Sequence, residues 1–283
     1  MDLVYRKNFE NCDIFIYSHI PFRPATGNHI YKVLTNSRAE ASQFNTDLAI
    51  YRDYDGVNIS GDNLMYNEYC GFYWIWKNYP IKKYVGMNHY RRYYNDCNNL
   101  PDIGKIFERK RIILNTPIQL RVPQGLKQSG TLMTNREWYA YWHNIEDFET
   151  LEAIITDKYP KYMEGFKKMA DAKYLHGCNM FTMDKDTFEE YCNFVFPLIM
   201  DFRKERGFFT LQDCVDYVTN NQHKYVKEGL TYYDINKQSR IVGYLAERIL
   251  GAFLWSGGSD SLIANSEEFK WSMARPDNYL ASK

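Results

Sequence analysis

The first third of the chain holds two short apolar runs that end in polar residues. Residues 12–19 read CDIFIYSH and residues 83–90 read KYVGMNHY. Runs of this length, rich in β-branched and aromatic side chains, are typical of buried strands. We therefore expect two buried strands, each with a functional loop at its C-terminal end.

Between these runs, residues 63–79 place apolar side chains every three to four positions. Leu64, Tyr69, Tyr73 and Trp76 make up one face of a predicted helix, which ends before a proline. An aromatic stripe at this spacing is more often core than a platform for a sugar. Strand, helix and strand in this order form the unit of a parallel sheet with right-handed crossovers.

The later part of the chain mixes strands and helices. We expect strands at residues 111–115 and 177–183, with a loop at residues 117–130. Helices are expected at residues 146–158, at residues 243–255, and from a cap at Asp184 or Asp186 to about Arg206. The whole pattern predicts an α/β fold whose first part is richer in strands.

Polar residues at the strand ends are the first candidates for a binding site. In an open α/β sheet, ligands bind beyond the C-terminal ends of the strands. The residues at those ends are His19, His89, Arg91 and Arg92.

Composition narrows the function classes. The 283 residues hold 35 basic and 35 acidic side chains, so the net charge is zero. A nucleic-acid binder would normally show a basic excess, and that class is set aside. Aromatic residues reach 17%, which suits surfaces that bind sugars or bases, or an aromatic-rich core. No dinucleotide-binding, P-loop or serine-hydrolase motif occurs in the sequence.

The cysteines and the N-terminal residues indicate in which cellular compartment the protein is expected. Six scattered cysteines without a CxxC pair fit reduced thiols in a cytoplasm. Residues 1–10 lack the apolar core of a signal peptide, and no run approaches the roughly 18 apolar residues of a spanning helix. We expect a cytoplasmic protein. The basic stretches at 105–111 and 158–173 are solvated faces or, alternatively, a peripheral contact with the inner face of a membrane.

Six phrases in order and spacing resemble a known family. They are the NIS and following Asn of residues 58–63, YCGFYWIWKN (69–78), YVGMNHYRRYY (84–94), GCNMFTM (177–183), EEYCNFVFPL (189–198) and GYLAERILGAFL (243–254). Together they resemble the family catalogued as domain of unknown function 4422, from capsule and O-antigen gene clusters. That family is similar to glycosyltransferase family 111, whose recognised activity is inverting galactofuranosyl transfer from UDP-galactofuranose.

The resemblance implies a GT-A-like nucleotide-sugar-binding fold with a mostly parallel central sheet. We expect one domain over residues 1–255, with a nucleotide-sugar half at 12–120, a helix-rich acceptor half at 121–255, and a flexible polar tail at 256–283. One departure is Gly71, where the family usually carries an acidic residue; if that acid touches the donor, sugar specificity differs here.

The segment with His89, Arg91 and Arg92 is the sharpest candidate site. GT-A transferases usually place an Asp-x-Asp metal motif at the end of this strand. Guanidinium groups match phosphate oxygens and are always charged, so we expect these arginines to replace the metal. The alternative is a pair of surface arginines. We therefore expect no cofactor and no metal site.

Two Asp-x-Asp strings do occur in the sequence. Because of them, a metal-dependent transferase stays the alternative to the metal-independent one. Residues 53–55 precede the NIS phrase rather than end a strand, and residues 184–186 lie where a helix cap is expected. We interpret both as a turn or a cap.

Further donor-binding candidates are polar residues near the predicted cleft. Each residue could instead have a purely structural role: as a histidine in a loop, as a cap of a turn, as a hydrogen-bond partner for backbone groups, or as a member of a buried ion pair. The candidates are His19, Asn63, Asn179, Arg240 and Arg248.

An inverting transferase also needs a carboxylate that takes the proton of the acceptor hydroxyl. Glu247 is flanked by apolar residues, so burial would raise its pKa towards a useful base, while Arg248 or Arg240 could hold it ionised. A structural Glu–Arg pair is the alternative, and Asp213 and Asp147 are further candidates for the base.

The resulting hypothesis is transfer of a hexose, with galactofuranose as first choice, to a glycan or lipid-linked glycan acceptor in cell-surface polysaccharide synthesis. The rivals are a retaining hexopyranosyl transferase, a non-catalytic glycan-binding module, and transfer of another activated group onto sugars.

Overall fold

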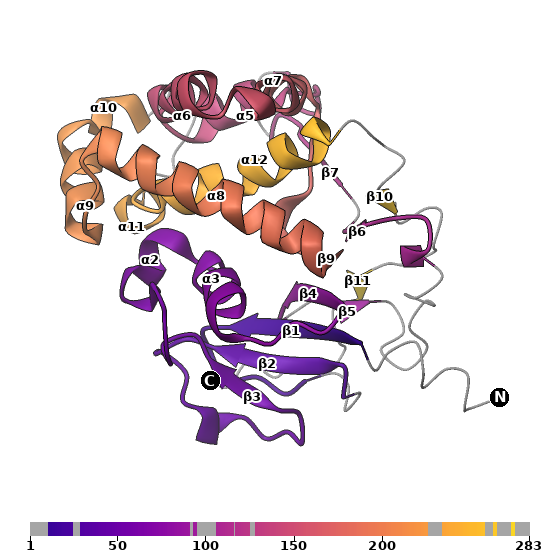
Figure 1. The fold of residues 1–283 in the computed structure, drawn as a ribbon. Coiled ribbons are helices and arrows are strands. Elements are labelled where there is room, and N and C mark those ends of the chain that lie inside the picture. Colours follow the sequence, from indigo (N-terminus) through magenta and orange to yellow (C-terminus); the bar gives the residue numbers. More distant parts are fainter. Residues whose placement is uncertain are drawn as a thin grey trace.

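The computed structural model describes residues 11–24, 29–90, 93–94, 106–115, 117–124, 128–225, 234–257, 263–264 and 273–274. Figure 1 shows two regions, a twisted sheet and a body of helices that covers one of its faces. The expected α/β architecture is confirmed.

The central sheet has seven strands in the order β10-β6-β9-β4-β1-β2-β3. Strand β1 is parallel to both of its neighbours β2 and β4, whereas β9 is antiparallel to β4 and β6. The strands are β1 (Cys12–Ser18), β2 (Tyr31–Thr35), β3 (Ile50–Arg52), β4 (Tyr84–His89), β6 (Ile112–Leu114), β9 (Phe181–Asp184) and β10 (Ile263–Ala264). All seven residues of β1 are buried, as expected for a central parallel strand.

Two small sheets correct sequence expectations. Strand β7 (Ile118–Gln119) pairs with β8 (Tyr174–Leu175) within the stretch expected as a loop. Strand β5 (Tyr93–Tyr94) pairs with β11 (Met273–Ala274). Strands β10 and β11 both come from residues 256–283, the expected tail, and they pair with β6 and β5 respectively.

The helix expected at residues 63–79 is two helices, α2 (Asn63–Tyr66) and α3 (Tyr69–Asn78). They are separated at Asn67, which has a left-handed φ of 55°. Asparagine tolerates positive φ better than most residues do. The break turns the chain, and the predicted face is core only in part: Tyr69 is buried, whereas Leu64 is 41% exposed and Tyr73 and Trp76 are partly buried.

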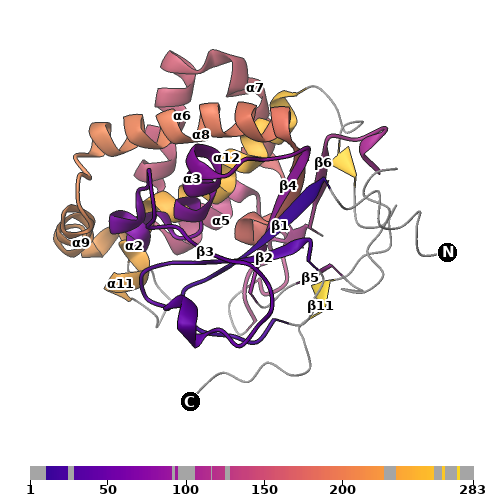
Figure 2. The ribbon, with the colours of Figure 1, turned by 60° about the horizontal axis from the view of Figure 1, so that its bottom comes forward.

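The remaining helices form the helical body. They are α5 (Asn135–Trp142), α6 (Ile145–Lys158), α7 (Met163–Asp171), α8 (Lys185–Arg206), α9 (Leu211–Asn220), α10 (Gln222–Tyr225), α11 (Ile235–Gln238) and α12 (Ile241–Ser256). Figure 1 shows α3 nearest the sheet, α8 and α12 above it, and α5 to α7 outermost. Figure 2 shows α2 and α11, far apart in sequence, lying side by side.

Helix α8 begins and ends as its sequence predicts. The Asp184 carboxylate accepts a hydrogen bond from the Thr187 backbone N–H at 2.9 Å, and Gly207 ends the helix with a φ of 69°. Asp184 also pairs with Arg111 at 3.0 Å. The interpretation of residues 184–186 as a cap is therefore confirmed.

Two other expectations need correction. Residues 53–55 do follow a strand, because Asp53 comes directly after β3, a strand too short to show a clear apolar run. Residues 177–183 are not strand throughout: Gly177–Asn179 form a 3-10 turn, with Cys178 at a left-handed φ of 63°, before β9 begins.

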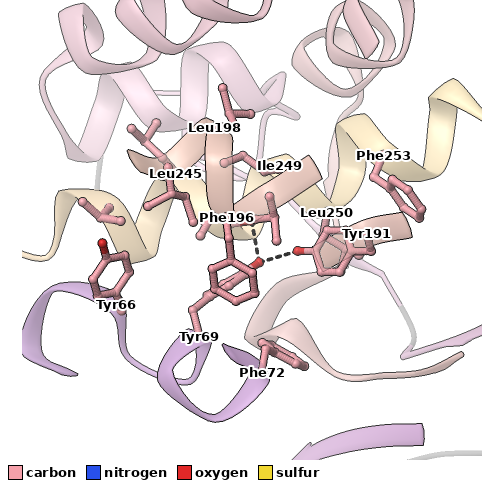
Figure 3. Packing of buried hydrophobic residues seen from close by; sticks show 14 of the residues in the cluster. Tyr66, Tyr69, Phe72, Tyr191, Phe196, Leu198, Leu245, Ile249, Leu250 and Phe253 are labelled. Carbon is pink, nitrogen blue, oxygen red and sulfur yellow. Dashed lines mark hydrogen bonds between the residues drawn. The ribbon is translucent and has the colours of Figure 1, made fainter. Parts of the chain in front are cut away.

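Buried aromatic residues join the helices to the sheet side of the core. Figure 3 shows the Tyr69 hydroxyl of α3 directed at the Tyr191 hydroxyl, beside apolar residues of α12. The Tyr69 hydroxyl lies 2.7 Å from the Tyr191 hydroxyl and 2.7 Å from the Ala246 carbonyl oxygen. A buried tyrosine hydroxyl needs such partners, so Tyr69 fixes how α3, α8 and α12 meet.

Candidate functional site

A pocket of about 330 Å³ opens where the parallel strands end. From β1 the chain proceeds outward to β2 and β3, and then returns to β4 on the other side of β1. The C-terminal ends of β1 and β4 therefore meet at a topological switch point, the usual place for a ligand in an open α/β sheet. The pocket is lined by Tyr17, His19, Asn36, Arg38, Asn63, Leu64, Asn67, Glu68, Met87, Asn88, His89, Cys178, Asp234, Asn236, Lys237 and Arg240.

The ends of β1 and β4 supply the pocket floor. Parallel pairing sets Tyr17 beside His89. His19 is exposed and His89 half-buried, and both line the pocket as predicted. The buried Tyr90 ring contacts both of their rings, with centroids 5.8 Å from His19 and 4.3 Å from His89. These contacts hold the imidazoles at the mouth of the switch point.

A chain of hydrogen bonds runs from a buried carboxylate into the pocket. The Tyr17 hydroxyl donates to Asp53 at 2.7 Å and accepts from the Asn63 amide at 2.6 Å. The Asn63 oxygen accepts from the Asn36 amide at 3.0 Å. Burial raises the pKa of Asp53 to about 6, opposed by the Tyr17 bond. The network fixes the amide orientation of two pocket residues.

Helix α12 contributes the opposite wall through Arg240. Its guanidinium donates to the Asn67 side-chain oxygen, with Nε at 2.8 Å. A Cβ atom at Gly243, one turn further on, would lie 2.2 Å from the Asn67 nitrogen. Glycine at this position therefore lets the bend at Asn67 approach α12 closely, which brings Arg240 to the pocket.

The pocket cations have few acidic neighbours. Among the described residues, the partner of the Arg240 guanidinium is the neutral Asn67 amide, and no carboxylate lies within ion-pair distance. Lys237 lies 3.9 Å from Asp234, and Arg38 is exposed at the rim. A guanidinium held by a neutral amide keeps its full charge available to an anion.

A carboxylate that the sequence reasoning missed also lines the pocket. Glu68, the residue before α3, accepts a hydrogen bond from the Asn179 amide at 2.8 Å. Asn179 is buried and its oxygen lies 2.9 Å from the Tyr69 hydroxyl. Asn179 therefore lies behind Glu68, outside the pocket lining, and holds that carboxylate in place.

Glu247 and Arg248 are not among the residues that line the pocket, although Glu247 contacts the lining residue Cys178. The Glu247 carboxylate accepts from the Cys178 backbone N–H at 3.2 Å, and its side chain is 23% exposed. Burial raises its pKa, and Arg248 at 3.5 Å opposes that rise. Arg248 is buried above the Tyr139 ring at 5.2 Å, inside the helical body.

The other predicted groups fall in three places. Arg91 and Arg92 lie outside the described residues, so their role stays a prediction. Asp147 is buried against Arg206 at 2.6 Å in the helical body. Asp213 closes a capping box with Thr210 at the start of α9. The two aspartates thus have structural partners, and neither lines the pocket.

Gly71, where the resemblance leads one to expect an acid, faces the core. A Cβ at this position would lie 2.8 Å from the Tyr17 ring and 3.1 Å from Leu34. The position does not line the pocket, and the close approach of α3 to β1 requires a glycine here. The expectation that this departure alters a donor contact therefore has no support in the position of Gly71.

The described residues contain no group of three or more His, Cys, Asp or Glu side chains placed to hold a metal ion. No described helix is long and apolar enough to cross a membrane.

A mostly parallel sheet with a polar pocket at its switch point is the arrangement in which α/β proteins usually bind their ligands. Comparison with known proteins gives the family: the chain belongs to the family described as "Domain of unknown function (DUF4422)", which matches residues 13–216. This part of the expected resemblance is confirmed. No curated protein matches the chain.

Among solved structures, the chain is similar to the apo form of WbbM, described as a bifunctional glycosyltransferase. The two share 21% sequence identity and a TM-score of 0.67. The match covers 95% of this chain and 46% of the WbbM chain, so this chain spans about half the length of that protein. The likeness shows that the two share a fold.

Proposed function

We propose that this chain is a glycosyltransferase that transfers a hexose from a nucleotide diphosphate sugar to a hydroxyl group of a carbohydrate. The observation that carries the proposal is the polar pocket at the switch point, where Arg240 presents a guanidinium without an acidic partner among the described residues. Membership of the family and the fold shared with WbbM support the same class of reaction.

The cations suit a diphosphate leaving group. Negative charge grows on the diphosphate as its bond to the sugar breaks, and a fixed cation stabilises that charge most in the transition state. Arg240, Arg38 and Lys237 line one pocket and supply this charge. Arg91 and Arg92 follow closely in sequence after β4, whose end lines the pocket, so we keep them in the same role. The proposed reaction needs no metal ion.

Proton transfer needs a carboxylate beside the acceptor. The acceptor oxygen attacks the anomeric carbon, the bond from that carbon to the phosphate oxygen breaks, and the diphosphate leaves with the electron pair. We assign the released proton to Glu68, because its carboxylate lines the pocket and Asn179 orients it. Glu247 stays the alternative base; it lies behind Cys178, a lining residue that its carboxylate contacts.

The finer assignments follow from the resemblance to glycosyltransferase family 111. The first-choice donor is UDP-galactofuranose, transfer inverts the anomeric centre, and the acceptor is a glycan or a lipid-linked glycan at the inner face of a membrane. His19, His89 and Asn63 then contact the nucleotide or the sugar from the pocket floor.

A donor screen tests the proposal. The full chain is incubated with UDP-sugars, with and without a chelator, and release of UDP and transfer to glycan acceptors are followed by mass spectrometry. We expect turnover with one or a few UDP-hexoses and the same rate with chelator. Binding of glycans without any turnover would support a binding module instead. Anomeric analysis of the product separates inversion from retention.

Variants test the assigned roles. Glu68→Gln should lower kcat by about 10²-fold to 10⁴-fold, as removal of a general base does. Glu247→Gln is made in parallel, and a loss confined to that variant would move the base to Glu247. Arg240→Ala should weaken UDP binding. Glu164→Gln, at a side chain that is 79% exposed on α7, is the control and should keep full turnover.

A further inference from the structure

The backbone turn beside the pocket is left-handed at two successive residues, Cys178 with a φ of 63° and Asn179 with a φ of 47°. No other two neighbouring non-glycine residues in the described part of the chain share this conformation. Asparagine tolerates it, whereas the Cβ atom of a cysteine crowds the backbone there. Such a backbone persists only where its surroundings enforce it, and it is common at functional sites.

The turn fixes the amide that holds Glu68. Asn179 is 1% exposed, and both polar atoms of its side chain are in use. The nitrogen donates to the Glu68 carboxylate at 2.8 Å, and the oxygen lies 2.9 Å from the Tyr69 hydroxyl. A buried side chain follows its own backbone, so a change in the turn would move the group that orients Glu68.

Glu247 holds the other residue of the turn. One of its carboxylate oxygens accepts from the Cys178 backbone N–H at 3.2 Å, and the other faces the Arg248 guanidinium at 3.5 Å. Both oxygens of Glu247 are therefore engaged. Glu68 differs, because only one of its oxygens accepts a hydrogen bond from a described residue, and because its side chain lines the pocket.

We propose that Glu247 is a positioning residue that holds Cys178 in its left-handed conformation. The turn thereby sets the Asn179 amide, which in turn orients Glu68. Arg248 fixes the Glu247 carboxylate on the side away from the turn. This role differs from that of a base, because Glu247 acts as a hydrogen-bond acceptor for the backbone and takes no proton. The inference rests on the proposed function for the role of Glu68 as the base.

Substitutions at Glu247 separate a positioning residue from a base. Glu247→Gln keeps an oxygen that can accept the backbone hydrogen bond but removes the basic carboxylate. Glu247→Ala removes the acceptor as well. Because Glu247→Ala leaves the buried Arg248 without its carboxylate, the same variant is also made with Arg248→Met, in case the single variant does not fold.

A glycine at position 178 tests whether Glu247 acts through the turn. Glycine adopts a positive φ without strain, so Cys178→Gly should hold the turn even when Glu247 is replaced by alanine. Gln128→Gly is the matched control, since Gln128 also has a left-handed φ of 66° but is exposed and does not line the pocket.

Turnover, UDP affinity and the rate at which iodoacetamide labels Cys178 are measured on the full chain, the last by peptide mass spectrometry. We expect Glu247→Gln to keep a kcat close to that of the wild type. Glu247→Ala should lower kcat about 10-fold to 100-fold, as misplacement of a catalytic group does. Adding Cys178→Gly should restore most of that loss, and adding Gln128→Gly should restore none.

Two further readouts distinguish this role from general destabilisation. The affinity for UDP should stay the same in Glu247→Ala, because Arg240 and its support at Asn67 are untouched. Cys178 should be labelled faster in Glu247→Ala than in Glu247→Gln, because the turn loosens only in the first. Both variants lack the negative charge, so the comparison excludes a direct effect of that charge on the thiol.

Three outcomes would overturn the inference. A loss of kcat in Glu247→Gln as large as that in Glu68→Gln would make Glu247 a base. A loss in Glu247→Ala that Cys178→Gly does not restore would show that Glu247 acts by another route. Equal labelling of Cys178 in the wild type and in both Glu247 variants would show that Glu247 does not hold the turn. If the wild type turns over no UDP-sugar, the proposed function fails, and the labelling rates alone decide whether Glu247 holds the turn.

Discussion

Each half of the molecule buries an aspartate completely, and the two halves treat the charge differently. In the helical body, Asp147 meets the Arg206 guanidinium at 2.6 Å. In the sheet half, Asp53 accepts one hydrogen bond from Tyr17, and its second oxygen has no partner among the described residues. Arg52, next in sequence, pairs with the exposed Asp55 instead.

The difference lies in where each network ends. Arg206 also donates to the Tyr217 hydroxyl, which accepts from Asn144 at 2.8 Å, so the helical network closes on itself and ties α6, α8 and α9 together. The Asp53 network passes through Tyr17 to Asn63 and Asn36, which line the pocket. A closed network serves stability, whereas an open one orients groups for a ligand.

Arg206→Leu should have the largest effect on stability. It leaves the Asp147 carboxylate buried without a cation, and removal of one partner of a buried pair typically costs about 3–5 kcal/mol. Chemical denaturation measures the loss. Arg206→Leu with Asp147→Asn should recover part of it. If the single variant loses less than 1 kcal/mol, the helical network is not the closed ion pair described above.

Asp53→Asn should change the pH dependence of stability. The folded pKa of about 6 lies above the ordinary value of 3.8, so the native state binds more protons than the unfolded chain between these values. This carboxyl therefore makes the wild type lose stability as pH rises from about 4 to 6, and the variant lacks that loss.

The stability difference between Asp53→Asn and the wild type should thus move in favour of the variant by about 3 kcal/mol over this range. Urea denaturation at several pH values measures it. Asp147, whose pKa is also raised to about 6, is present in both proteins and drops out of the difference. Parallel curves for the two proteins would show that Asp53 titrates normally.

Tyr17→Phe should lower stability by about 1–3 kcal/mol at pH 7, because it removes the one described side-chain donor to a buried carboxylate. Tyr159→Phe is the matched control: its hydroxyl makes the same bond, at 2.8 Å, to the partly exposed Asp201, where water can replace it. Thermal melts compare the two. Equal losses would mean that burial of Asp53 adds nothing.

Gly243→Ala should have the smallest effect on stability and a local effect on the pocket. The added methyl group displaces the Asn67 side chain, which can move, and thereby releases Arg240. We expect a severalfold loss of UDP affinity with a melting temperature close to that of the wild type. Gly257→Ala, where the nearest atom lies 3.9 Å away, is the control and should bind UDP normally. Unchanged affinity in both variants would argue against Asn67 as the support of Arg240.

Strand ends were readable from the sequence because a buried strand leaves a continuous apolar run. His19 and His89 follow from that pattern, and the structure brings both to the pocket with Asn63 and Arg240. Glu68 was missed because the apolar stripe continues across Asn67, and nothing in the periodicity marks the left-handed residue that bends the chain.

The sequence also does not show whether two adjacent residues of a helix reach the same site. Successive side chains on a helix point about 100° apart. Glu247 thus reaches Cys178 while Arg248 lies over the Tyr139 ring, and the two side chains still pair at 3.5 Å, which is the structural Glu–Arg pair kept as the alternative. The wall around α11 was not expected either, because a helix of four residues is too short to show a period.

The bond between Arg240 and Asn67 joins residues 173 positions apart. A chain under synthesis has made β1 to β4 long before α12 exists, so its early half emerges with one side of the ligand site missing. A compound that contacts both sides of the site would bind the complete folded protein but not a chain that still lacks α12. By mass action, the substrate would then also select for complete assembly.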